Sequence, residues 1–536
     1  MIDRAVEAIS ELYNRARNHL RDQVVVDGKV DRKRLAERQV AAHALAFIAT
    51  ELEACRQISA WAERMDGPYE REIAAAYVGE VARTLSASIS LGPNECVDVR
   101  ETGVTEEDLD ATVRSAPVLA FVGAHARSDN YLSIARQAQD KGCGRLGLDD
   151  STLEDIQQEF ARFTDKQVLP IAQDVHRQDV LIPIEIVQQL GEMGVFGLTI
   201  PEGYGGLGLS KVAMCVVTEE LSRGYIGVGS LGTRAEIAGE LILAGGTDEQ
   251  KAYWLPKICS GEVLPTAVFT EPNHGSDAAH FTTRAVKQPD GSYVVNGAKT
   301  WITHASRTDL MTLMARTNPD DPGAGGLSMF LVPKQRGEDE LGKEFPDEGL
   351  SGTEIKVLGY RGMKEYELSF EDFRVESNAL LGGQEGKAFK QLMMTFEGAR
   401  IQTAARAVGV AQAAFNEAIR YAHERVQFGS PLADFGRVGR KLGRMVCNLQ
   451  AARQLAYFAA REKDKGTRCD VEAGMAKLLA TRAAWENADA GVQIHGGNGY
   501  AEEYTISRLL VDARVLSIFE GANEIQADVI ARRLLS

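Results

Sequence analysis

The segment Thr270–Asp277 (TEPNHGSD) carries residue types that suit a phosphorylated ligand. We expect it to form a loop at the end of a β-strand, because the pattern around it has a period of two. Gly275 would let backbone N–H groups approach a phosphate, and Thr270 and Ser276 supply hydroxyl groups. Taken alone, the segment is also compatible with an ordinary polar turn.

Trp301 and Thr303 lie two residues apart in a segment that reads as a strand, so we expect them on one face of it. Tryptophan offers a flat apolar wall and threonine offers a hydroxyl group. Together they suit the ring and the polar edge of an isoalloxazine. A tryptophan buried in the core is the ordinary alternative.

Two further groups of residues stand at predicted helix ends. Arg425 and Phe428 follow one helix, and Gln493, Gly496 and Gly497 end another. The planar guanidinium of arginine donates two hydrogen bonds at once, which suits a pyrophosphate. A surface arginine in a loop would explain Arg425 equally simply.

Glu520, between Phe519 and Gly521, is a candidate general base. A carboxylate removed from water against an apolar ligand is a competent acceptor for a weakly acidic proton. The apolar residue before Glu520 and the flexible glycine after it suit such a position. The alternative is a glutamate that precedes a helix and interacts with the helix dipole.

Arg234 stands in an otherwise apolar helical pattern, Gly232–Gly239 (GTRAEIAG). A cation inside a protein is costly unless it meets an anion. A ligand carboxylate would supply that anion. Glu236 or Glu240 would also supply it, in which case Arg234 has a purely structural role.

Bulk composition excludes several classes of protein. The 536 residues are 44% hydrophobic and 25% charged, which indicates a globular protein of several domains. A net charge of −16 disfavours binding to nucleic acid, and no apolar run is long enough to insert into a membrane. The seven cysteines stand singly, without a CxxC pair, so we expect reduced thiols, no metal site and a cytoplasmic location.

Hydrophobic periodicity predicts helices at both ends of the chain and strands between them. We expect helical segments over residues 1–150, 151–262 and 376–536, and a β segment of six or seven strands over 263–375. Asp150 or Ser151 is the expected N-cap at the first boundary. Helices are predicted over Ala41–Ala62 and Ile73–Ile89, a hairpin over Thr283–Val295, and strands over Leu310–Ala315, Leu327–Val332, Glu354–Leu358 and Glu367–Phe370.

Six segments, in order, resemble the acyl-CoA dehydrogenase family: Gly197–Gly208, Thr270–Asp277, Asn296–Thr303, Arg425–Gly429, Gln493–Tyr500 and Phe519–Gln526. The resemblance covers roughly residues 152–536. It implies an α+β fold with an N-terminal helical domain, a middle β-barrel or sandwich domain and a C-terminal four-helix-type bundle. Residues 1–150 would be an additional helical extension.

The resemblance implies that the protein binds FAD and an acyl-CoA. The implied FAD contacts are Phe269, Thr270, Gly275, Ser276, Trp301, Thr303, Ala522 and Glu524, with Arg425, Phe428, Gln493, Gly496 and Gly497 reaching the FAD of a neighbouring subunit. The implied substrate contacts are Arg234, Ser276, Glu397 and Arg400. Many relatives have threonine where this chain has Ala522, which puts one hydroxyl contact to the cofactor in doubt. An ion pair within the helix is the alternative for Glu397 and Arg400.

By the same resemblance, Glu520 removes the α-proton of a thioester, and the reducing equivalents pass to an electron-transferring flavoprotein. Some relatives carry the base immediately before the arginine that matches Arg400, where this chain has Ala399. Arg234 points to a dicarboxylic acyl group, and the implied reaction is (2S)-methylsuccinyl-CoA to mesaconyl-CoA in the ethylmalonyl-CoA pathway. Glutaryl-CoA, a short branched acyl-CoA, O₂-dependent oxidase or monooxygenase chemistry, and a non-catalytic scaffold remain alternatives.

The N-terminal extension contains an echo of the C-terminal bundle. Arg38–Leu91 and Arg440–Gly496 both read as a long helix, a charged turn and an alanine-rich helix. The extension is either a degenerate copy of part of the bundle or a chance likeness between alanine-rich helices. We expect a homodimer in which residues 1–150 take the place of a second dimer. A tetramer with an appended domain is the alternative.

Overall fold

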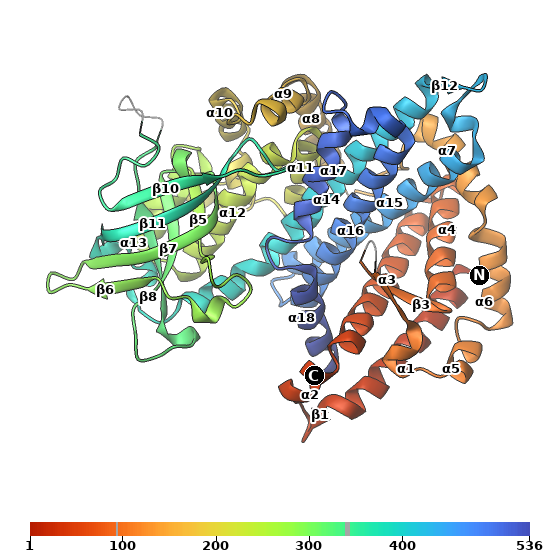
Figure 1. Cartoon of the computed structure of the whole chain (residues 1–536), viewed down its shortest axis with the longest axis horizontal. Coiled ribbons are helices and arrows are strands. Elements are labelled where there is room, and N and C mark those ends of the chain that lie inside the picture. The colour runs from red at the N-terminus through yellow and green to blue at the C-terminus, as the bar shows by residue number, and fades with distance from the viewer. Residues whose placement is uncertain (93–94, 149, 338–342) are drawn as a thin grey trace. The chain divides into compact units, whose positions relative to one another are not determined.

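The computed structural model describes residues 1–92, 95–148, 150–337 and 343–536. They form two compact units, Met1–Gln158 with Thr403–Ser536, and Glu159–Gln402. The first unit is almost entirely helical, and the second combines helices with a seven-stranded sheet. The predicted α+β class, with helices on both sides of a β segment in the chain, is confirmed (Figure 1).

The N-terminal part of the first unit is built on amphipathic helices. In α1 the buried residues Ala5, Ile9, Leu12, Ala16, Leu20 and Val24 recur every three or four positions, which places them on one face. The helices are α1 (Ile2–Val24), α2 (Arg32–Glu37), α3 (Gln39–Met65), α4 (Pro68–Leu85), α5 (Glu106–Ala111), α6 (Ala116–His125) and α7 (Ser128–Lys141).

Two small hairpins in this part were not predicted. They are β1 (Val25–Val26) with β2 (Lys29–Val30), and β3 (Ser88–Gly92) with β4 (Glu95–Asp98). The predicted helix Ile73–Ile89 is too long at its end, because α4 stops at Leu85 and Ile89 belongs to β3. Ile89 and Leu91 are buried and alternate with less buried serines, a period of two that indicates a strand.

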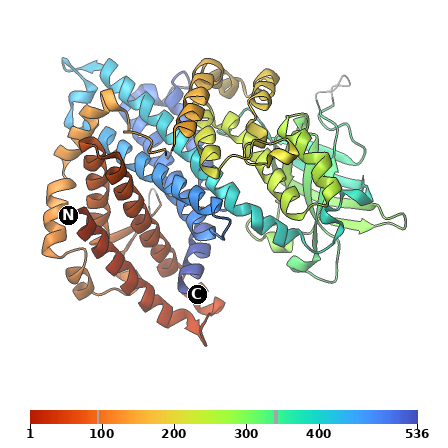
Figure 2. The ribbon, with the colours of Figure 1, turned by 180° about the vertical axis from the view of Figure 1, so that it is seen from behind.

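The C-terminal part of the first unit is a helical bundle. It contains α14 (Ala388–Glu424) from Thr403 onward, α15 (Gly436–Asp464), α16 (Asp470–His495), α17 (Thr505–Leu516) and α18 (Asn523–Leu535), with a hairpin of β12 (Val426–Gln427) and β13 (Ser430–Pro431). The helix pairs α3–α4 and α15–α16 lie side by side in Figures 1 and 2, and α3 also packs on α18. Both helix pairs of the sequence echo therefore exist, while their common origin stays a prediction.

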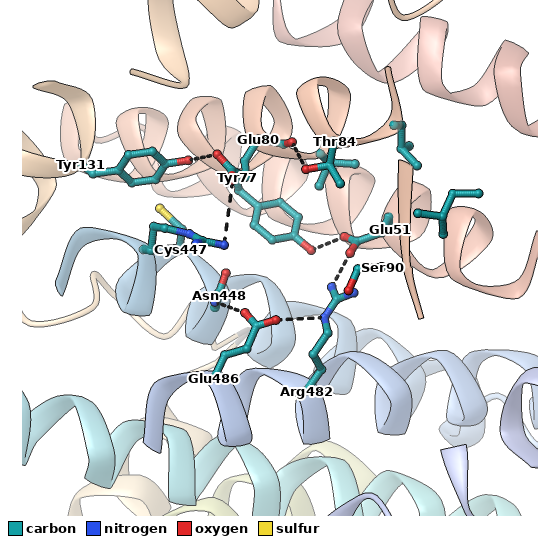
Figure 3. Close-up of a pocket in the computed structure, with 14 residues that line it drawn as sticks. Glu51, Tyr77, Glu80, Thr84, Ser90, Tyr131, Cys447, Asn448, Arg482 and Glu486 are labelled. Carbon is teal, nitrogen blue, oxygen red and sulfur yellow. Dashed lines mark hydrogen bonds and ion pairs between the residues drawn. The ribbon is translucent and has the colours of Figure 1, made fainter. Parts of the chain in front are cut away.

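A network of buried charges joins the extension to the bundle (Figure 3). Arg482 of α16 pairs with Glu51 of α3, and the Tyr77 hydroxyl group of α4 donates to Glu51 Oε2 at 2.7 Å. Asn448 Nδ2 of α15 donates to Glu486 Oε2 at 2.8 Å, and Glu486 lies 3.9 Å from Arg482 Nε. These side chains line a cavity of about 160 Å³. The extension is thus docked through paired charges as well as apolar contacts.

Helix α8 (Ser151–Phe163) begins in the first unit and ends in the second, and Leu153 N–H donates to Asp150 Oδ1 at 2.9 Å, which caps its N-terminus. Five further α-helices of the second unit precede α14. They are α9 (Leu169–Gln178), α10 (Ile184–Glu192), α11 (Lys211–Gly224), α12 (Ile226–Gly245) and α13 (Asp248–Cys259). Among the described residues, no helix is both long and apolar enough to cross a bilayer.

The sheet has the strand order β10-β11-β7-β6-β8-β5, with β9 paired to β8. Its strands are β5 (Pro265–Val268), β6 (Arg284–Lys287), β7 (Tyr293–Thr303), β8 (Leu310–Arg316), β9 (Leu327–Pro333), β10 (Leu350–Ile355) and β11 (Glu365–Val375). The predicted hairpin is confirmed as β6–β7. The predicted strand Glu354–Leu358 is misplaced, because β10 lies earlier and pairs over its whole length with β11.

We predict that Arg482→Met destabilises the protein by ~3–5 kcal/mol, because it leaves Glu51 buried without its cation. Denaturant unfolding measures the change. Arg420→Met is a matched control, because Arg420 is exposed and pairs with Glu417 and Glu424 on the surface of α14, where a pair is worth at most about 1 kcal/mol. If the free energy of unfolding fell by the same amount in both variants, the network would not have the structural importance assigned to it.

Candidate active site

Glu520 lies in a short loop between α17 and α18, with a left-handed backbone (φ 53°). Its Oε2 accepts a hydrogen bond from Arg406 Nη2 at 2.6 Å and another from the Thr403 hydroxyl group. The Arg406 side chain is fully buried, and the Glu520 side chain is 13% exposed. The carboxylate is therefore held on a buried cation of α14 while one edge stays accessible.

The loop around Glu520 is fixed by further contacts. Gly521 O accepts from Lys477 Nζ at 2.8 Å and from Gln526 Nε2 at 3.2 Å. The Arg406 guanidinium lies 4.9 Å from the centre of the Phe519 ring, a cation–π contact. Gly521 has a φ of 93°, which only glycine adopts readily. These contacts hold a strained backbone in one conformation.

The sequence predicted Glu520 as a carboxylate removed from water against an apolar ligand, and it did not predict the partners of Glu520 within the chain. The carboxylate is paired with Arg406 and bonded to Thr403. Both partners were missed. The available signal was Arg406 itself, a charged residue in an alanine-rich stretch of a helix, where a buried arginine requires an anion.

A buried ion pair anchors the loop Thr270–Asp277. Lys299 Nζ of β7 lies 2.9 Å from Glu271 Oε1 and also donates to Phe269 O at 2.8 Å. Glu271 accepts bonds from the N–H groups of Thr282 and Thr283 at 2.7 and 2.9 Å. Burial alone would raise the pKa of Glu271, but the Lys299 charge and these bonds lower it to about 2. The start of the loop is therefore rigid.

The far end of this loop is open. Gly275 and Ser276 are exposed, and a Cβ added to Gly275 would meet no atom within 4 Å. Neither its backbone angle nor its neighbours in this chain therefore require glycine at this position. Free space above a rigid backbone fits the close approach of a phosphate group.

Trp301 breaks the regular geometry of β7. It has a φ of 59°, and the register with β11 shifts beside it, as in a β-bulge. The indole is 55% exposed, whereas Thr303 is 7% exposed. The sequence predicted that Trp301 and Thr303 lie on one face, because they are two residues apart in a strand. The bulge breaks this period, so the two side chains do not share a face. An exposed tryptophan beside the open loop still fits a flat ring that would cover it.

Thr303 belongs to a polar cluster at the end of β7. Its hydroxyl group donates to Glu365 Oε2 of β11 at 3.0 Å, and both side chains are buried. Burial raises the pKa of Glu365, whereas the hydrogen bond from Thr303 and the charge of Arg234 lower it. Burial has the larger effect, so the pKa is about 7. Arg234 of α12 is half-buried, and its charge also acts on His304. Glu365 and His304 were not predicted as site residues.

Glu236 and Glu240, the alternative partners considered for Arg234, both pair with a lysine. Lys211 of α11 pairs with Glu236 and, at 2.7 Å, with Glu240. Glu236 also accepts from the Thr199 hydroxyl group at 2.7 Å. Lys211 therefore supplies positive charge to both glutamates.

Two predicted residues for the CoA arm lie on α14 in the second unit. Glu397 and Arg400 are 9% and 8% exposed, and they are one helical turn apart, as predicted. Gly398 between them is approached by Glu240, whose Oε1 would lie 2.7 Å from an added Cβ. A larger residue at position 398 would therefore displace the carboxylate of Glu240.

The predicted residues at the two helix ends lie together at one corner of the first unit. Tyr421, four residues before Arg425, stacks on His495, two residues after Gln493, with ring centres 4.0 Å apart. Phe428 is 96% exposed at the tip of the β12–β13 hairpin, with a left-handed backbone (φ 52°). Arg425, Gln493, Gly496 and Gly497 are exposed as well. A large apolar side chain in this state indicates a surface that another molecule covers.

Ala522 and Glu524 lie at the start of α18. Ala522 O accepts the first helical hydrogen bonds, from the N–H groups of Ile525 and Gln526, at 2.9 and 3.0 Å. Glu524 is exposed in the first turn. Within the described part of the chain, no group of three His, Cys, Asp or Glu side chains is arranged to hold a metal ion.

Comparisons with known proteins agree with this arrangement. The chain matches the acyl-CoA dehydrogenase N-terminal domain over residues 150–262, the middle domain over 266–373 and the C-terminal domain over 386–535. It is 54% identical to a (2S)-methylsuccinyl-CoA dehydrogenase from Cereibacter sphaeroides, covering 99% of this chain and 97% of that protein. It is 38% identical to an acyl-CoA dehydrogenase from Bacillus subtilis (strain 168), covering 70% and 95%.

Among solved structures, the butyryl-CoA dehydrogenase from Megasphaera elsdenii superposes with a TM-score of 0.67 at 34% identity, covering 71% of this chain and 98% of that one. Of these three proteins, only the Cereibacter relative also matches the N-terminal extension of this chain. The fold, the order of the three matched domains and the relatives lead to one conclusion: the chain belongs to the acyl-CoA dehydrogenase family.

Proposed function

We propose that the protein is an FAD-dependent dehydrogenase that oxidises (2S)-methylsuccinyl-CoA to mesaconyl-CoA and passes electrons to an electron-transferring flavoprotein. The proposal is carried by the relative that is 54% identical over almost the whole chain, extension included. The site supports it with a positioned carboxylate, Glu520, and a half-buried cation in α12, Arg234. Reduction of an artificial electron acceptor by the purified protein with this thioester, and not in its absence, tests the proposal.

In this proposal Glu520 accepts the α-proton of the thioester. The Arg406 guanidinium holds the carboxylate in place, and a carboxylate must be ionised to act as a base. The Thr403 hydroxyl group and Arg406 both donate to Oε2, which holds the carboxylate in one orientation. The backbone N–H of Glu520 would stabilise negative charge on the thioester oxygen.

The cofactor would be held by the open loop and the exposed tryptophan of the second unit. Gly275 and Ser276 would bind the pyrophosphate, Trp301 would cover the ring, and Phe269, Thr270 and Thr303 would complete the contacts. Bound FAD would supply the acceptor for the β-hydrogen. Glu524 and the backbone of Ala522 would contribute from the start of α18, where no hydroxyl group replaces the threonine of other family members.

The remaining substrate contacts are assigned to α12 and α14. Arg234 would bind the free carboxyl group of the acyl chain, and Ser276, Glu397 and Arg400 would bind the thioester arm and the pantetheine–nucleotide part of CoA. A dicarboxylic acyl group would bring an anion to Arg234, which is half-buried in α12. Glutaryl-CoA has the same terminal charge, so a panel of dicarboxylic acyl-CoAs separates the two substrates.

We infer a homodimer from the exposed corner around Phe428. Arg425, Phe428, Gln493, Gly496 and Gly497 would reach the ADP half of the FAD bound by a second copy. In the first unit, α3 and α4 cover part of α15 and α16, the surface that a second dimer would otherwise need. The extension would therefore replace that second dimer.

We predict that Glu520→Gln retains FAD but loses ~10²–10⁴-fold in kcat, because an amide cannot accept the proton. Steady-state kinetics measure turnover, and flavin absorbance and thermal unfolding verify the folded holoenzyme. Glu503→Gln, an exposed change in the same unit, is the matched control and retains activity. A Glu520→Gln enzyme with more than about a tenth of the wild-type rate would exclude this base.

Arg234→Met is expected to raise KM for the dicarboxylic thioester strongly, since loss of one partner of a buried pair costs ~3–5 kcal/mol. Turnover of a neutral acyl-CoA of equal length should be retained or improved. Arg223→Met is the control, because Arg223 pairs with Glu220 and Asp165 and should affect stability without discriminating between substrates. Equal losses on both substrates with Arg234→Met would show a structural role.

The intact protein should be a homodimer of about 117 kDa, twice the chain mass of 58.3 kDa, by light scattering. Phe428→Asp should produce monomers and release FAD, because charge is placed in the proposed subunit contact. Deletion of residues 1–150 should expose apolar surface and produce tetramers or aggregates. A tetrameric intact protein would contradict the role assigned to the extension.

A further inference from the structure

Only one of the two oxygens of the Glu365 carboxyl group has a hydrogen-bond partner among the described residues. It stands at the first position of β11, opposite Thr303 of β7, and is 6% exposed. Oε2 accepts from the Thr303 hydroxyl group at 3.0 Å, whereas Oε1 is buried and, within the described residues, has no hydrogen-bond partner. A buried polar atom without a partner costs ~1–3 kcal/mol, and more when it is charged. A ligand group at this position would remove that cost.

His304, next to Thr303, has an unused ring nitrogen. Its backbone is left-handed (φ 63°), and its N–H donates to Lys364 O at 2.9 Å, which fixes the residue against the start of β11. Nε2 is buried and has no partner among the described residues. Burial, with the charges of Arg307, Arg336, Lys334 and Arg234, lowers the pKa of His304 to about 3. The imidazole is therefore neutral and can donate one hydrogen bond.

α12 brings a cation to the same place. The helix packs on β5, and the Thr266 hydroxyl group of β5 donates to Thr303 O at 2.7 Å. Just before α12, the Tyr225 hydroxyl group donates to Arg361 O at 2.6 Å, four residues before Glu365. Arg234 acts electrostatically on both Glu365 and His304. The cation Arg234 of α12 and two polar side chains, His304 at the end of β7 and Glu365 of β11, therefore lie close enough to interact electrostatically.

We propose that Glu365, in its protonated form, and His304 bind the free carboxyl group of the acyl substrate together with Arg234. Arg234 supplies the opposite charge, and Glu365 donates from Oε1 to one carboxylate oxygen while Thr303 holds Oε2. His304 Nε2–H donates to the same group. This assignment rests on the proposed function and explains how the site selects a dicarboxylic acyl group over a neutral one.

A pH dependence follows from the chemistry of Glu365. The groups around it are Arg234 of α12, His304 at the end of β7, and Lys364 of β11, whose ammonium group binds Glu354 of β10 at 3.0 Å. The pKa of Glu365 is about 7, so the carboxyl group is protonated below that value and can donate. Above it, the carboxylate repels the substrate carboxylate and partly neutralises Arg234. Dicarboxylate binding is therefore lost as the pH rises through about 7.

The test compares two thioesters, the dicarboxylic acyl-CoA and a neutral acyl-CoA with a methyl group in place of the free carboxyl. In the wild-type holoenzyme, the ratio of their kcat/KM values should fall by up to about tenfold per pH unit above pH 7. Calorimetric binding in two buffers at pH 8 should show proton uptake with the dicarboxylic ligand and not with the neutral one. Both measurements use the intact enzyme.

The Glu365→Gln variant should abolish the fall of the ratio and the proton uptake, because an amide donates at every pH. Glu367→Gln, an exposed change two residues along β11, should behave like the wild type. A flat wild-type ratio between pH 6 and 9, or an unchanged fall in Glu365→Gln, would overturn the assignment. No turnover of the dicarboxylic thioester at any pH would instead refute the proposed function, while proton uptake on binding would still support the role of Glu365.

Discussion

The pairing of Arg406 with Glu520 is the interaction on which the candidate chemistry depends. A buried arginine requires an anion, and the strained loop between α17 and α18 brings Glu520 to it. The loop in turn needs Gly521, and Lys477 and Gln526 bind its carbonyl groups. One electrostatic requirement thus fixes the backbone and orients the carboxylate. The rest of the bundle serves as the rigid support for this arrangement.

In the second unit, too, buried charges are paired with opposite charges. The Glu271–Lys299 pair anchors the phosphate loop, and Lys211 binds Glu236 and Glu240 between α11 and α12. In each case a buried charge is matched by an opposite one, so the backbone around it is rigid. The cluster of Glu365 and His304 departs from this rule, because Glu365 Oε1 and His304 Nε2 are buried without a hydrogen-bond partner in the part of the chain that the structure describes. Departures of this kind are expected where a ligand completes the structure.

Local patterns predicted most of the fold, and distant contacts account for what they missed. Periodicity placed the helical and β segments, and the β6–β7 hairpin, because amphipathic patterns follow from burial of one face. Arg406 and Glu520 are separated by 114 positions, so no pattern links them. The bulge at Trp301 depends on a register shift against β11, which the sequence of β7 alone does not contain. Arg234 stood out, but its neighbours Glu365 and His304 come from other parts of the chain.

The network around Arg482 has an evolutionary consequence. Its members come from both the extension and the bundle, namely Glu51 and Tyr77 on one side and Arg482 on the other. A descendant that lost the extension would expose apolar residues of α15 and α16 that α3 and α4 cover, and one that lost Arg482 would leave Glu51 without its cation. Either loss is harmful unless several substitutions occur together. Once such a network had formed, selection would act against the loss of either side. An added segment would then become an obligatory part of the protein.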